Sequence, residues 1–228
     1  MEQSFKTQKS TLKRHPERGH YDKETIHKIL DEGFVCHVGF IFHEKAFVLP
    51  TGYGRIGNTV YIHGSMASMM LKAGINEPEI TISVTLLDGL VLAKSAFSHS
   101  FNYRSVVIFG KARLVDDPEE KINALYALTE QVIPGRWNEV RTPNDKEMKQ
   151  TLVLAVNIEE ASAKIRQGDP NDNNEDLSFP VWAGVLPLTL KAGQPIPASY
   201  NQEGLKVPDH VTGYRNLSNF QPGSMRSK

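Results

Sequence analysis

The sequence contains one cysteine, has no long apolar run and carries no excess charge, and each of these absences excludes a class of protein. The lone Cys36 cannot form an intrachain disulfide, which favours a reducing compartment and a cytoplasmic protein. No run of 18 apolar residues occurs, so nothing is predicted to span a membrane. Lys and Arg total 26 and Asp and Glu total 26, and this zero balance argues against nucleic-acid binding.

Several catalytic and metal-binding motifs are missing as well. There is no P-loop sequence G-x-x-x-x-G-K-[ST] and no zinc-protease sequence H-E-x-x-H. The eight histidines are scattered and one cysteine cannot build a thiolate cluster, so no metal site is predicted. The N-terminus carries Lys6, Lys9, Lys13 and Arg14 but no apolar segment, which is unlike a secretory signal.

The sequence does contain a series of short strand patterns separated by turns. Strands are predicted over residues 34–42, 46–53, 59–63, 79–87, 90–97, 105–115, 152–158 and 161–166. Helices are predicted after the capping residues Asp22 and Asp117, over 65–74 and over 143–150. Because many neighbouring strands are joined by hairpin turns, the fold class is mainly β, an antiparallel barrel with a few flanking helices.

The composition along the chain divides it into three regions. Residues 1–20 form a polar arm that can order against a partner, and residues 21–190 form the barrel domain. Residues 191–228 form an extension rich in Pro and Gly at its start, which we expect to wrap over the barrel.

The segment from Tyr61 to Gly74 predicts a binding site for an anion. A strand runs through His63-Gly64-Ser65 into a short helix, with Ser65 in the N-cap position and Gly74 in the C′ position. The free N–H groups at such a helix start favour a negatively charged group. The alternative is an ordinary strand–helix junction followed by a solvated lysine, Lys72.

Four passages and their order resemble the FMN-binding split-barrel superfamily. They are GFVCHVGFIFHEKAFVLPTGYGRIGNTVYIHGS from residue 33, FNYRSVVIFGKARLV from 101, KIRQGDPND from 164 and FPVWAGVLPL from 179. The closer resemblance is to the pyridoxamine 5′-phosphate oxidase-like branch, which also contains nitroimidazole-resistance proteins, and it covers roughly residues 20–190. It implies an antiparallel split barrel and a homodimer that binds FMN between its subunits.

The resemblance also implies which residues contact the cofactor. The phosphate end is assigned to Gly64, Ser65, Ser68, Met69 and Lys72, together with Tyr103, Arg104 and Ser105 at the polar start of a strand. The flavin ring is assigned to Pro50, Thr51, Tyr53 and His63, and to Trp182, which can pack across the subunit boundary or fix the C-terminal segment to its own barrel. Arg136 and Trp137 are further candidates for the substrate side. No catalytic residue is assigned beyond His63, which can transfer a proton near neutral pH or serve only as a hydrogen-bonded structural residue.

Three functions remain open on the sequence alone. The first is an FMN-dependent oxidoreductase acting on a small molecule at the dimer interface, with the flavin supplying the redox chemistry. The second is a flavin carrier, store or sensor without turnover. The third is a haem-handling split barrel, for which His63 or His210 is the candidate ligand. True pyridoxamine-phosphate oxidase activity is not expected, because the tail lacks that enzyme's arginine motif.

Overall fold

The protein is described here by a computed structural model covering residues 4–214. Its strands are β1 (Gly19–His20), β2 (Val35–Phe42), β3 (Lys45–Ile56), β4 (Thr59–Ser65), β5 (Glu79–Leu92), β6 (Ser100–Leu114), β7 (Thr151–Asn157), β8 (Glu160–Arg166) and β9 (Gly184–Pro187). Its helices are α1 (Lys23–Glu32), α2 (Met69–Asn76), α3 (Pro118–Val132), α4 (Asp145–Gln150) and α5 (Asp209–Thr212), with 3-10 turns η1 (Pro16–Arg18), η2 (Ala96–Ser98) and η3 (Asn174–Asp176).

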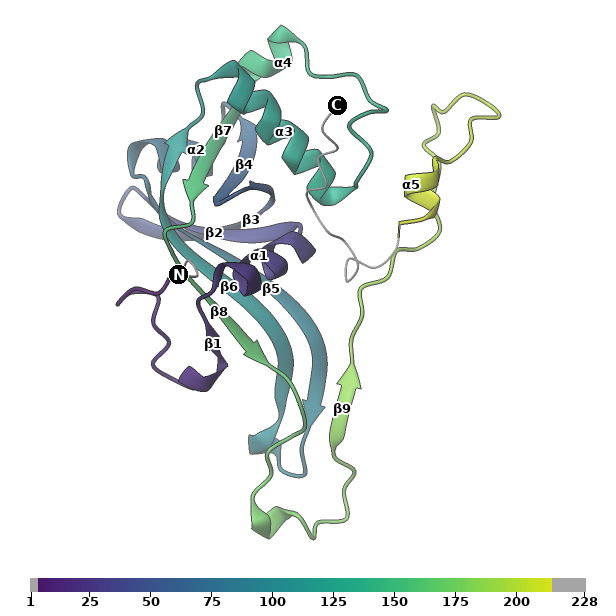
Figure 1. The fold of residues 1–228 in the computed structure, drawn as a ribbon. Coiled ribbons are helices and arrows are strands. Elements are labelled where there is room, and N and C mark those ends of the chain that lie inside the picture. Colours follow the sequence, from purple (N-terminus) through teal and green to yellow (C-terminus); the bar gives the residue numbers. More distant parts are fainter. Residues whose placement is uncertain (1–3, 215–228) are drawn as a thin grey trace.

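The strands form one antiparallel sheet that closes on itself. Their order is β1-β8-β6-β7-β4-β3-β2-β5-β9, and an additional pairing between β5 and β6 completes a ring from β6 through β7, β4, β3 and β2 to β5. Figure 1 shows β5 and β6 as long curved strands that extend beyond the ring, with β8 and β9 alongside them. This arrangement confirms the predicted antiparallel split barrel.

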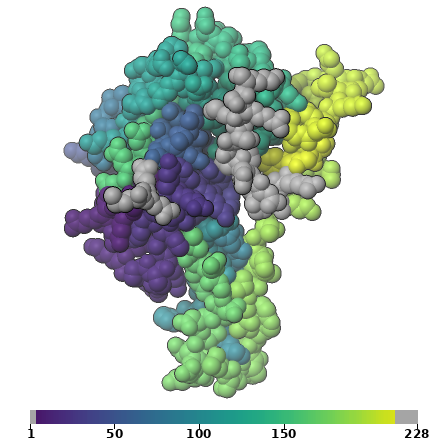
Figure 2. All heavy atoms as spheres, in the orientation of Figure 1, coloured from purple at the N-terminus to yellow at the C-terminus, as the bar shows by residue number. Residues whose placement is uncertain are grey.

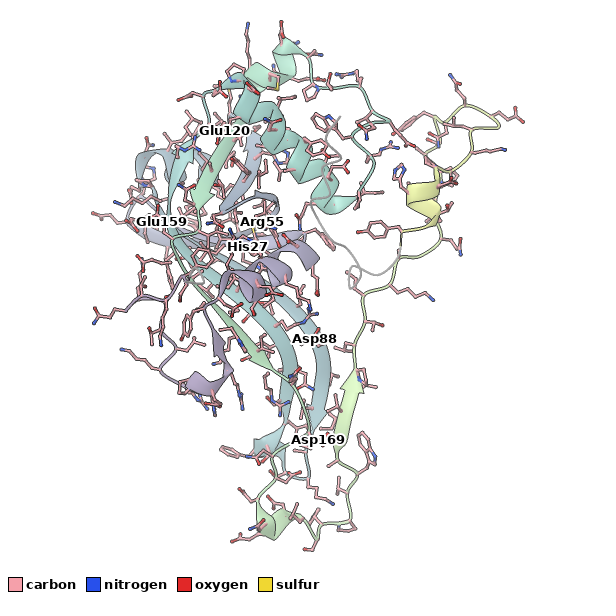
Figure 3. All side chains as sticks on the ribbon, viewed as in Figure 1. His27, Arg55, Asp88, Glu120, Glu159 and Asp169 are labelled. Carbon is pink, nitrogen blue, oxygen red and sulfur yellow. The ribbon has the colours of Figure 1, made fainter. Side chains whose placement is uncertain are left out.

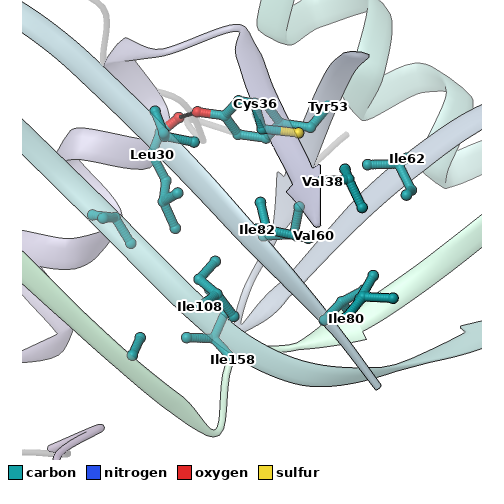
Figure 4. Packing of buried hydrophobic residues seen from close by; sticks show 14 of the residues in the cluster. Leu30, Cys36, Val38, Tyr53, Val60, Ile62, Ile80, Ile82, Ile108 and Ile158 are labelled. Carbon is teal, nitrogen blue, oxygen red and sulfur yellow. Dashed lines mark hydrogen bonds between the residues drawn. The ribbon is translucent and has the colours of Figure 1, made fainter. Parts of the chain in front are cut away.

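The barrel interior is filled by one face of each strand. Apolar side chains alternate along the strands, as period-2 patterning requires, and Val38, Ile82 and Ile108 are fully buried. Tyr53 lies among them, and its hydroxyl donates a hydrogen bond to the carbonyl of Leu30 on α1 at 2.5 Å (Figure 4). Helix α1 therefore covers the barrel next to this core.

An ion pair fixes α1 to the barrel wall. The Arg55 guanidinium on β3 donates two hydrogen bonds of 2.6 Å to the Asp31 carboxylate, and both side chains are largely buried (Figure 3). Burial raises the pKa of Asp31, and the bond from Arg55 opposes that rise. His27 lies one turn earlier on the same helix, and burial lowers its pKa to about 4.

Helix α3 covers the outer face of the sheet over β3 and β4. Asp117 caps the helix by accepting a hydrogen bond from the backbone N–H of Glu120, as the sequence predicts. A second apolar cluster lies under it, formed by Leu125 and Leu128 of the helix with Tyr61 and Val153 of the sheet. The opposite, inner face of these strands belongs to the main core.

Two sequence predictions about element boundaries need correction. Residues 79–97 do not form two strands, because β5 runs unbroken to Leu92 with an irregularity at Leu87–Gly89. Helix α2 begins after Ser68, whose hydroxyl accepts from the Leu71 N–H, whereas Ser65 still pairs with Thr151 in the sheet. Gly74 is not a C′ residue, because α2 continues past it to Asn76.

Gly74 has a packing role instead. A Cβ atom at this position would lie 2.8 Å from Leu154 Cδ1, so the missing side chain lets α2 approach β7. The sequence GYGRIG, residues 52–57, matches the dinucleotide-binding pattern G-x-G-x-x-G. Here it lies in β3 and in the β3–β4 turn, where Gly57 has φ 58°, and not in the strand-to-helix turn that the pattern requires.

The two terminal regions differ in how they contact the barrel. The first residues order against their own chain, with Phe5 buried and Gly19 of β1 paired with Lys164 of β8. Residues 191–207 are exposed along their whole length rather than wrapping the barrel (Figures 1 and 2). Contact resumes at α5, where His210 Nδ1 lies 3.5 Å from Glu139, and the Tyr214 hydroxyl donates to the Val132 carbonyl of α3. The rest of the predicted extension, residues 215–228, lies outside the described residues.

Candidate functional site

The barrel is split where β3 and β4 part. Residues 53–56 of β3 pair with β4, but the preceding residues 45–52 pair only with β2. On the other side of the opening, His63, Gly64 and Ser65 of β4 pair only with β7. Two diverging strand edges therefore present backbone N–H and C=O groups that pair with no further strand among residues 4–214.

A cavity of about 410 Å³ lies at the start of this split. It is lined by Gly52, His63, Leu125, Leu128, Thr129, Val132, Trp137, Pro143, Glu147 and Thr151. One wall consists of the apolar side chains of α3 and Trp137, and the other consists of strand residues. An apolar wall facing a few convergent polar groups is typical of a site for a flat organic ligand.

His63 is the titratable group best placed to act on a ligand in the cavity. Within the described part of the chain, its ring has no hydrogen-bond partner. Partial loss of hydration lowers the pKa of His63 below its ordinary value, so the ring is predominantly neutral at pH 7. A neutral imidazole can accept a proton, donate a hydrogen bond or bind a metal.

Glu147, the one carboxylate among the described residues that line the cavity, already has hydrogen-bond partners. Its two oxygens accept hydrogen bonds from Arg141 at 2.6 and 2.7 Å, and one also accepts from the Asn144 N–H in a capping box. Arg141 lowers the pKa of Glu147 to about 2, with the Asn144 N–H acting in the same direction. Glu147 therefore stays ionised and supplies no proton near neutral pH.

The predicted phosphate end lies next to the split, but the Ser68 hydroxyl and Gly64 have other contacts. The Ser68 hydroxyl caps α2, and a Cβ on Gly64 would lie 3.2 Å from Leu71 Cδ1, so this glycine accommodates the helix. Met69 packs against the main core. Lys72 is exposed on α2 and has no ion-pair partner among the described residues, which leaves it as the cation available beside Ser65.

The ring contacts predicted on β3 divide between the two faces of the strand. Tyr53 is fully buried in the core with its hydroxyl bonded to Leu30, so the prediction that it contacts a ligand needs correction. Thr51 shares the inner face with Tyr53 by strand alternation. Pro50 is exposed on the outer face with Gly52, where the split opens.

Arg104 is also placed differently from the prediction. Its Nε and one terminal nitrogen donate to Asp88 at 3.0 and 2.8 Å, and the other terminal nitrogen donates to Glu32 (Figure 3 labels Asp88). These bonds, those to Asp88 first, raise the pKa of Arg104. Arg104 also lies eight residues of strand before Ala112, where β6 first meets β7, which is roughly 25 Å of extended chain. The structure therefore does not bring Arg104 to Ser65 of the same chain.

The remaining predicted residues lie outside the split cavity of their own chain. Tyr103 lines a separate pocket, and the Ser105 hydroxyl donates to the Lys164 carbonyl at 3.4 Å. Trp182 is 68% exposed and packs against Gly184 at the start of β9, so it does not fix the extension to the barrel. A contact between Trp182 and a second subunit stays a prediction.

Sequence reasoning named Trp137 as a substrate-side candidate, and this residue does line the cavity. It missed Gly52, Thr129 and Thr151. Thr129 could have been found from helical spacing, because it follows Leu125 by one turn on α3. Thr151 could not have been found in this way, because only sheet pairing brings it opposite Ser65.

Comparison with known proteins identifies the family. A family model described as pyridoxamine 5′-phosphate oxidase matches residues 22–165, which is more than half of the chain. The chain belongs to the pyridoxamine 5′-phosphate oxidase family. No curated protein matches the chain.

Two solved structures resemble this family member over almost its whole length. The flavocytochrome Anf3 from Azotobacter vinelandii is 38% identical, covers 92% of this chain and 97% of its own, and has a TM-score of 0.86. The FAD and heme binding protein from Mycobacterium smegmatis is 36% identical, covers 89% and 100%, and has a TM-score of 0.84. A 5-nitroimidazole antibiotic resistance protein from Bacteroides thetaiotaomicron, described as putative, shares the fold at 22% identity, with coverage of 64% and 86% and a TM-score of 0.54.

Among the helices of residues 4–214, none is both long and apolar enough to cross a membrane. The same residues contain no cluster of three or more His, Cys, Asp or Glu side chains that could hold a metal ion. A cytoplasmic location stays a prediction from the sequence.

Proposed function

We propose that this family member is a flavin-binding redox protein that holds the flavin ring in the split between β3 and β4. The observation that carries the proposal is the pair of unsatisfied strand edges beside an apolar wall. A flavin ring is flat and apolar on its faces and carries hydrogen-bonding groups along one edge. The edge of the ring needs backbone donors and acceptors, and its faces need apolar contact. The open strand edges and the α3 wall of the split offer both.

Individual residues fit such a ligand. Leu128 and Val132 supply apolar surface, and Pro50 interrupts the N–H pattern at the edge of the split. His63 presents a neutral ring to the cavity, and Lys72 supplies a cation at the α2 end for a phosphate. Bound flavin would supply the electron transfer, while these residues bind it, orient it and exclude water.

The sequence predicts FMN as the flavin, whereas the name of the mycobacterial relative specifies FAD. The relative is similar over almost the whole chain, so its name favours FAD over FMN for this protein. An oxidoreductase acting on a small molecule stays the first function, with a flavin carrier as the alternative.

We also propose that the protein is a homodimer through the outer face of the sheet. Val35 and Ile41 of β2, Val48 of β3 and Leu87 of β5 are exposed on the barrel surface, Val48 to 65%. Apolar side chains gathered on one sheet face mark an association surface more often than a solvated one. The exposed Trp182 and the extended segment beyond β9 favour the same conclusion, because they project away from their own barrel.

The absorption spectrum of the purified protein tests the flavin proposal. We expect the protein to retain a flavin double band after incubation with FAD or FMN and desalting, and denaturation should release the bound flavin for identification. Replacing Gly52 with Leu should abolish retention, because the new side chain enters the cavity.

A matched control is Gly193→Leu, since a Cβ at Gly193 has no heavy atom within 4 Å. This variant should retain flavin like the wild type. If Gly52→Leu is folded and retains flavin equally well, the ring does not lie in the split. A colourless wild type under all conditions would overturn the flavin proposal itself.

Haem binding is the second candidate function, and two observations favour it. The name of the mycobacterial relative specifies heme and that of the Azotobacter relative specifies a flavocytochrome, and His63 presents a neutral ring with no hydrogen-bond partner among residues 4–214. His210, the other candidate ligand, has a buried Nε2 that has no hydrogen-bond partner in the same part of the chain, and its Nδ1 lies 3.5 Å from Glu139. A buried nitrogen cannot reach a haem iron without movement of α5, so His63 is the better candidate.

Comparison of His63→Ala with His210→Ala decides between these ligands. After reconstitution with haem, we expect an intense Soret band in the wild type and in His210→Ala, and loss or displacement of that band in His63→Ala. The reverse pattern would make His210 the ligand. Equal bands in all three proteins would exclude both residues.

A further inference from the structure

A second cavity, distinct from the split, lies on the outer face of the sheet between the N-terminal arm and strands β6 and β8. Its volume is about 340 Å³, which is within the size range of small-molecule sites. It is lined by Arg14, His15, Arg18, Phe97, Ser98, His99, Ser100, Tyr103, Lys164, Arg166 and Asn171. We call this the basic pocket.

The basic pocket carries a concentration of positive charge. Arg14, Arg18, Lys164 and Arg166 bring four basic side chains to it, and no Asp or Glu is among the lining residues. Arg18 forms an ion pair, with its Nε 3.6 Å from Glu17 on the same turn. Among residues 4–214, the other three cations have no ion-pair partner. The whole chain is neutral, so this cluster is a local feature and not a consequence of composition.

Arg166 is the most informative member of the cluster. It is 8% exposed, and its guanidinium donates to the side-chain oxygen of Asn102 and to the carbonyls of Gly168 and Asp169. All these acceptors are uncharged, so the cation is held in place without being neutralised. Burying a guanidinium without a counter-ion costs free energy, and a bound anion would remove that cost.

The neighbouring side chains extend this site toward the surface. Lys164 and Arg166 lie two residues apart on β8 and so point to the same face, and Tyr103 is the residue on β6 opposite Arg166. The arm closes the other side with Arg14 and Arg18, and β1 holds the arm in place by pairing with β8. Guanidinium groups and a lysine in one concave site match the geometry of phosphate oxygens.

We propose that the basic pocket binds the diphosphate group of a nucleotide. Two adjacent phosphates require more positive charge than one helix terminus supplies, and four cations around one cavity provide it. The aromatic side chains of Tyr103 and Phe97 provide surface on which a base can stack. The diphosphate can belong to a separate nucleotide, or to the ADP half of an FAD whose ring lies in the split of a partner subunit.

The proposal does not depend on the flavin proposal, since it predicts binding of ADP to the full chain without any flavin. The probes are ADP and inorganic pyrophosphate, titrated by calorimetry at low and at high salt. The test variant is Lys164→Ala, whose side chain lines the pocket and makes no ion pair among the described residues. Arg166 is left unchanged, because its bonds to loop carbonyls give it a structural role. The control is Lys111→Ala, a strand lysine outside the pocket that pairs with Glu79 at 3.6 Å.

We expect ADP to bind the wild type, with weaker binding at high salt, and to bind Lys164→Ala about tenfold less tightly. Lys111→Ala should match the wild type. Failure of both ADP and pyrophosphate to bind would overturn the proposal, and so would equal binding by Lys164→Ala and the wild type.

Titration with FAD and FMN then identifies the source of the diphosphate. If Lys164→Ala weakens FAD but not FMN, and ADP competes with FAD, the pocket holds the ADP half of the flavin. If both flavins bind the variant like the wild type while ADP binding falls, the pocket serves a separate nucleotide. A protein that binds ADP but no flavin would overturn the flavin proposal and leave this one intact.

Discussion

Substituting Gly54 tests the packing of α3 on the barrel, on which the split cavity depends. A Cβ at Gly54 would lie 2.6 Å from the backbone nitrogen of Leu128 and 2.7 Å from the carbonyl carbon of Ala127. Both are backbone atoms of α3, so no side-chain rotation can relieve the overlap. The helix must move away from β3 by about 1 Å to restore ordinary contact, which loosens Leu125 and Leu128 over the sheet.

The expected cost of Gly54→Ala is about 3 kcal/mol of unfolding free energy, at the upper end of the range for overpacked sites. For a chain of this size that corresponds to a fall in melting temperature of roughly 6–12 °C. Thermal unfolding followed by circular dichroism measures it. Flavin retention should fall as well, because Leu125 and Leu128 of the displaced helix line the cavity.

Gly52→Ala is the matched control, two residues earlier on the same strand and face. Its Cβ would meet only the Phe34 carbonyl at 3.8 Å, and neither glycine has a positive φ. We therefore expect a change within about 1 kcal/mol, of either sign. Equal melting temperatures for the two variants would refute the argument that α3 packs directly on the Gly54 backbone.

Three further predictions concern stability. Arg104→Leu should lower the unfolding free energy by about 2–3 kcal/mol in urea titration, because it leaves Glu32 buried without its partner. Adding Glu32→Leu should recover much of that loss, and no recovery would argue against the ion pair. Tyr53→Phe should cost about 1 kcal/mol and leave flavin affinity unchanged, whereas weaker flavin binding would return Tyr53 to the site. Burial lowers the pKa of His27 to about 4 from an ordinary 6.5, so between these pH values the unfolded state binds more protons than the folded state. The free energy of unfolding should therefore fall by up to about 3 kcal/mol as the pH drops from 6.5 to 4. His27→Gln should flatten that dependence, and an unchanged slope would show that His27 does not cause it.

The sequence alone was enough to predict the fold class, because strand alternation and turn residues act locally. The alternating pattern of 79–87, the turn at Gly57 and the cap at Asp117 each correspond to a structural feature at that position. Local patterns were less reliable at boundaries. Ser65 and Ser68 are both acceptable helix caps, and the pairing of Ser65 with Thr151 across 86 intervening positions decided between them.

The candidate site shows the same division between local and tertiary information. The segments around Pro50 and His63 could be identified from sequence, since a proline in a strand and a strand–helix junction are local signals. Tyr53 points into the core and Pro50 points outward. The alternation of β3 separates the two residues, but the sequence does not show which face of the strand is turned toward the core.

Only the tertiary structure decided which charged side chains from distant parts of the sequence lie next to one another. On the sequence alone Arg104 could bind a phosphate or form a surface ion pair, and in the fold it forms ion pairs because Glu32 and Asp88 lie against it. Arg14 and Arg166 are separated by most of the chain, yet they line one pocket because β1 pairs with β8. The residue pattern by itself determined a barrel and its faces. Long-range pairing determined which charges are neutralised and which have no counter-ion among the described residues, because electrostatic interactions depend on distance in space and not on separation in sequence.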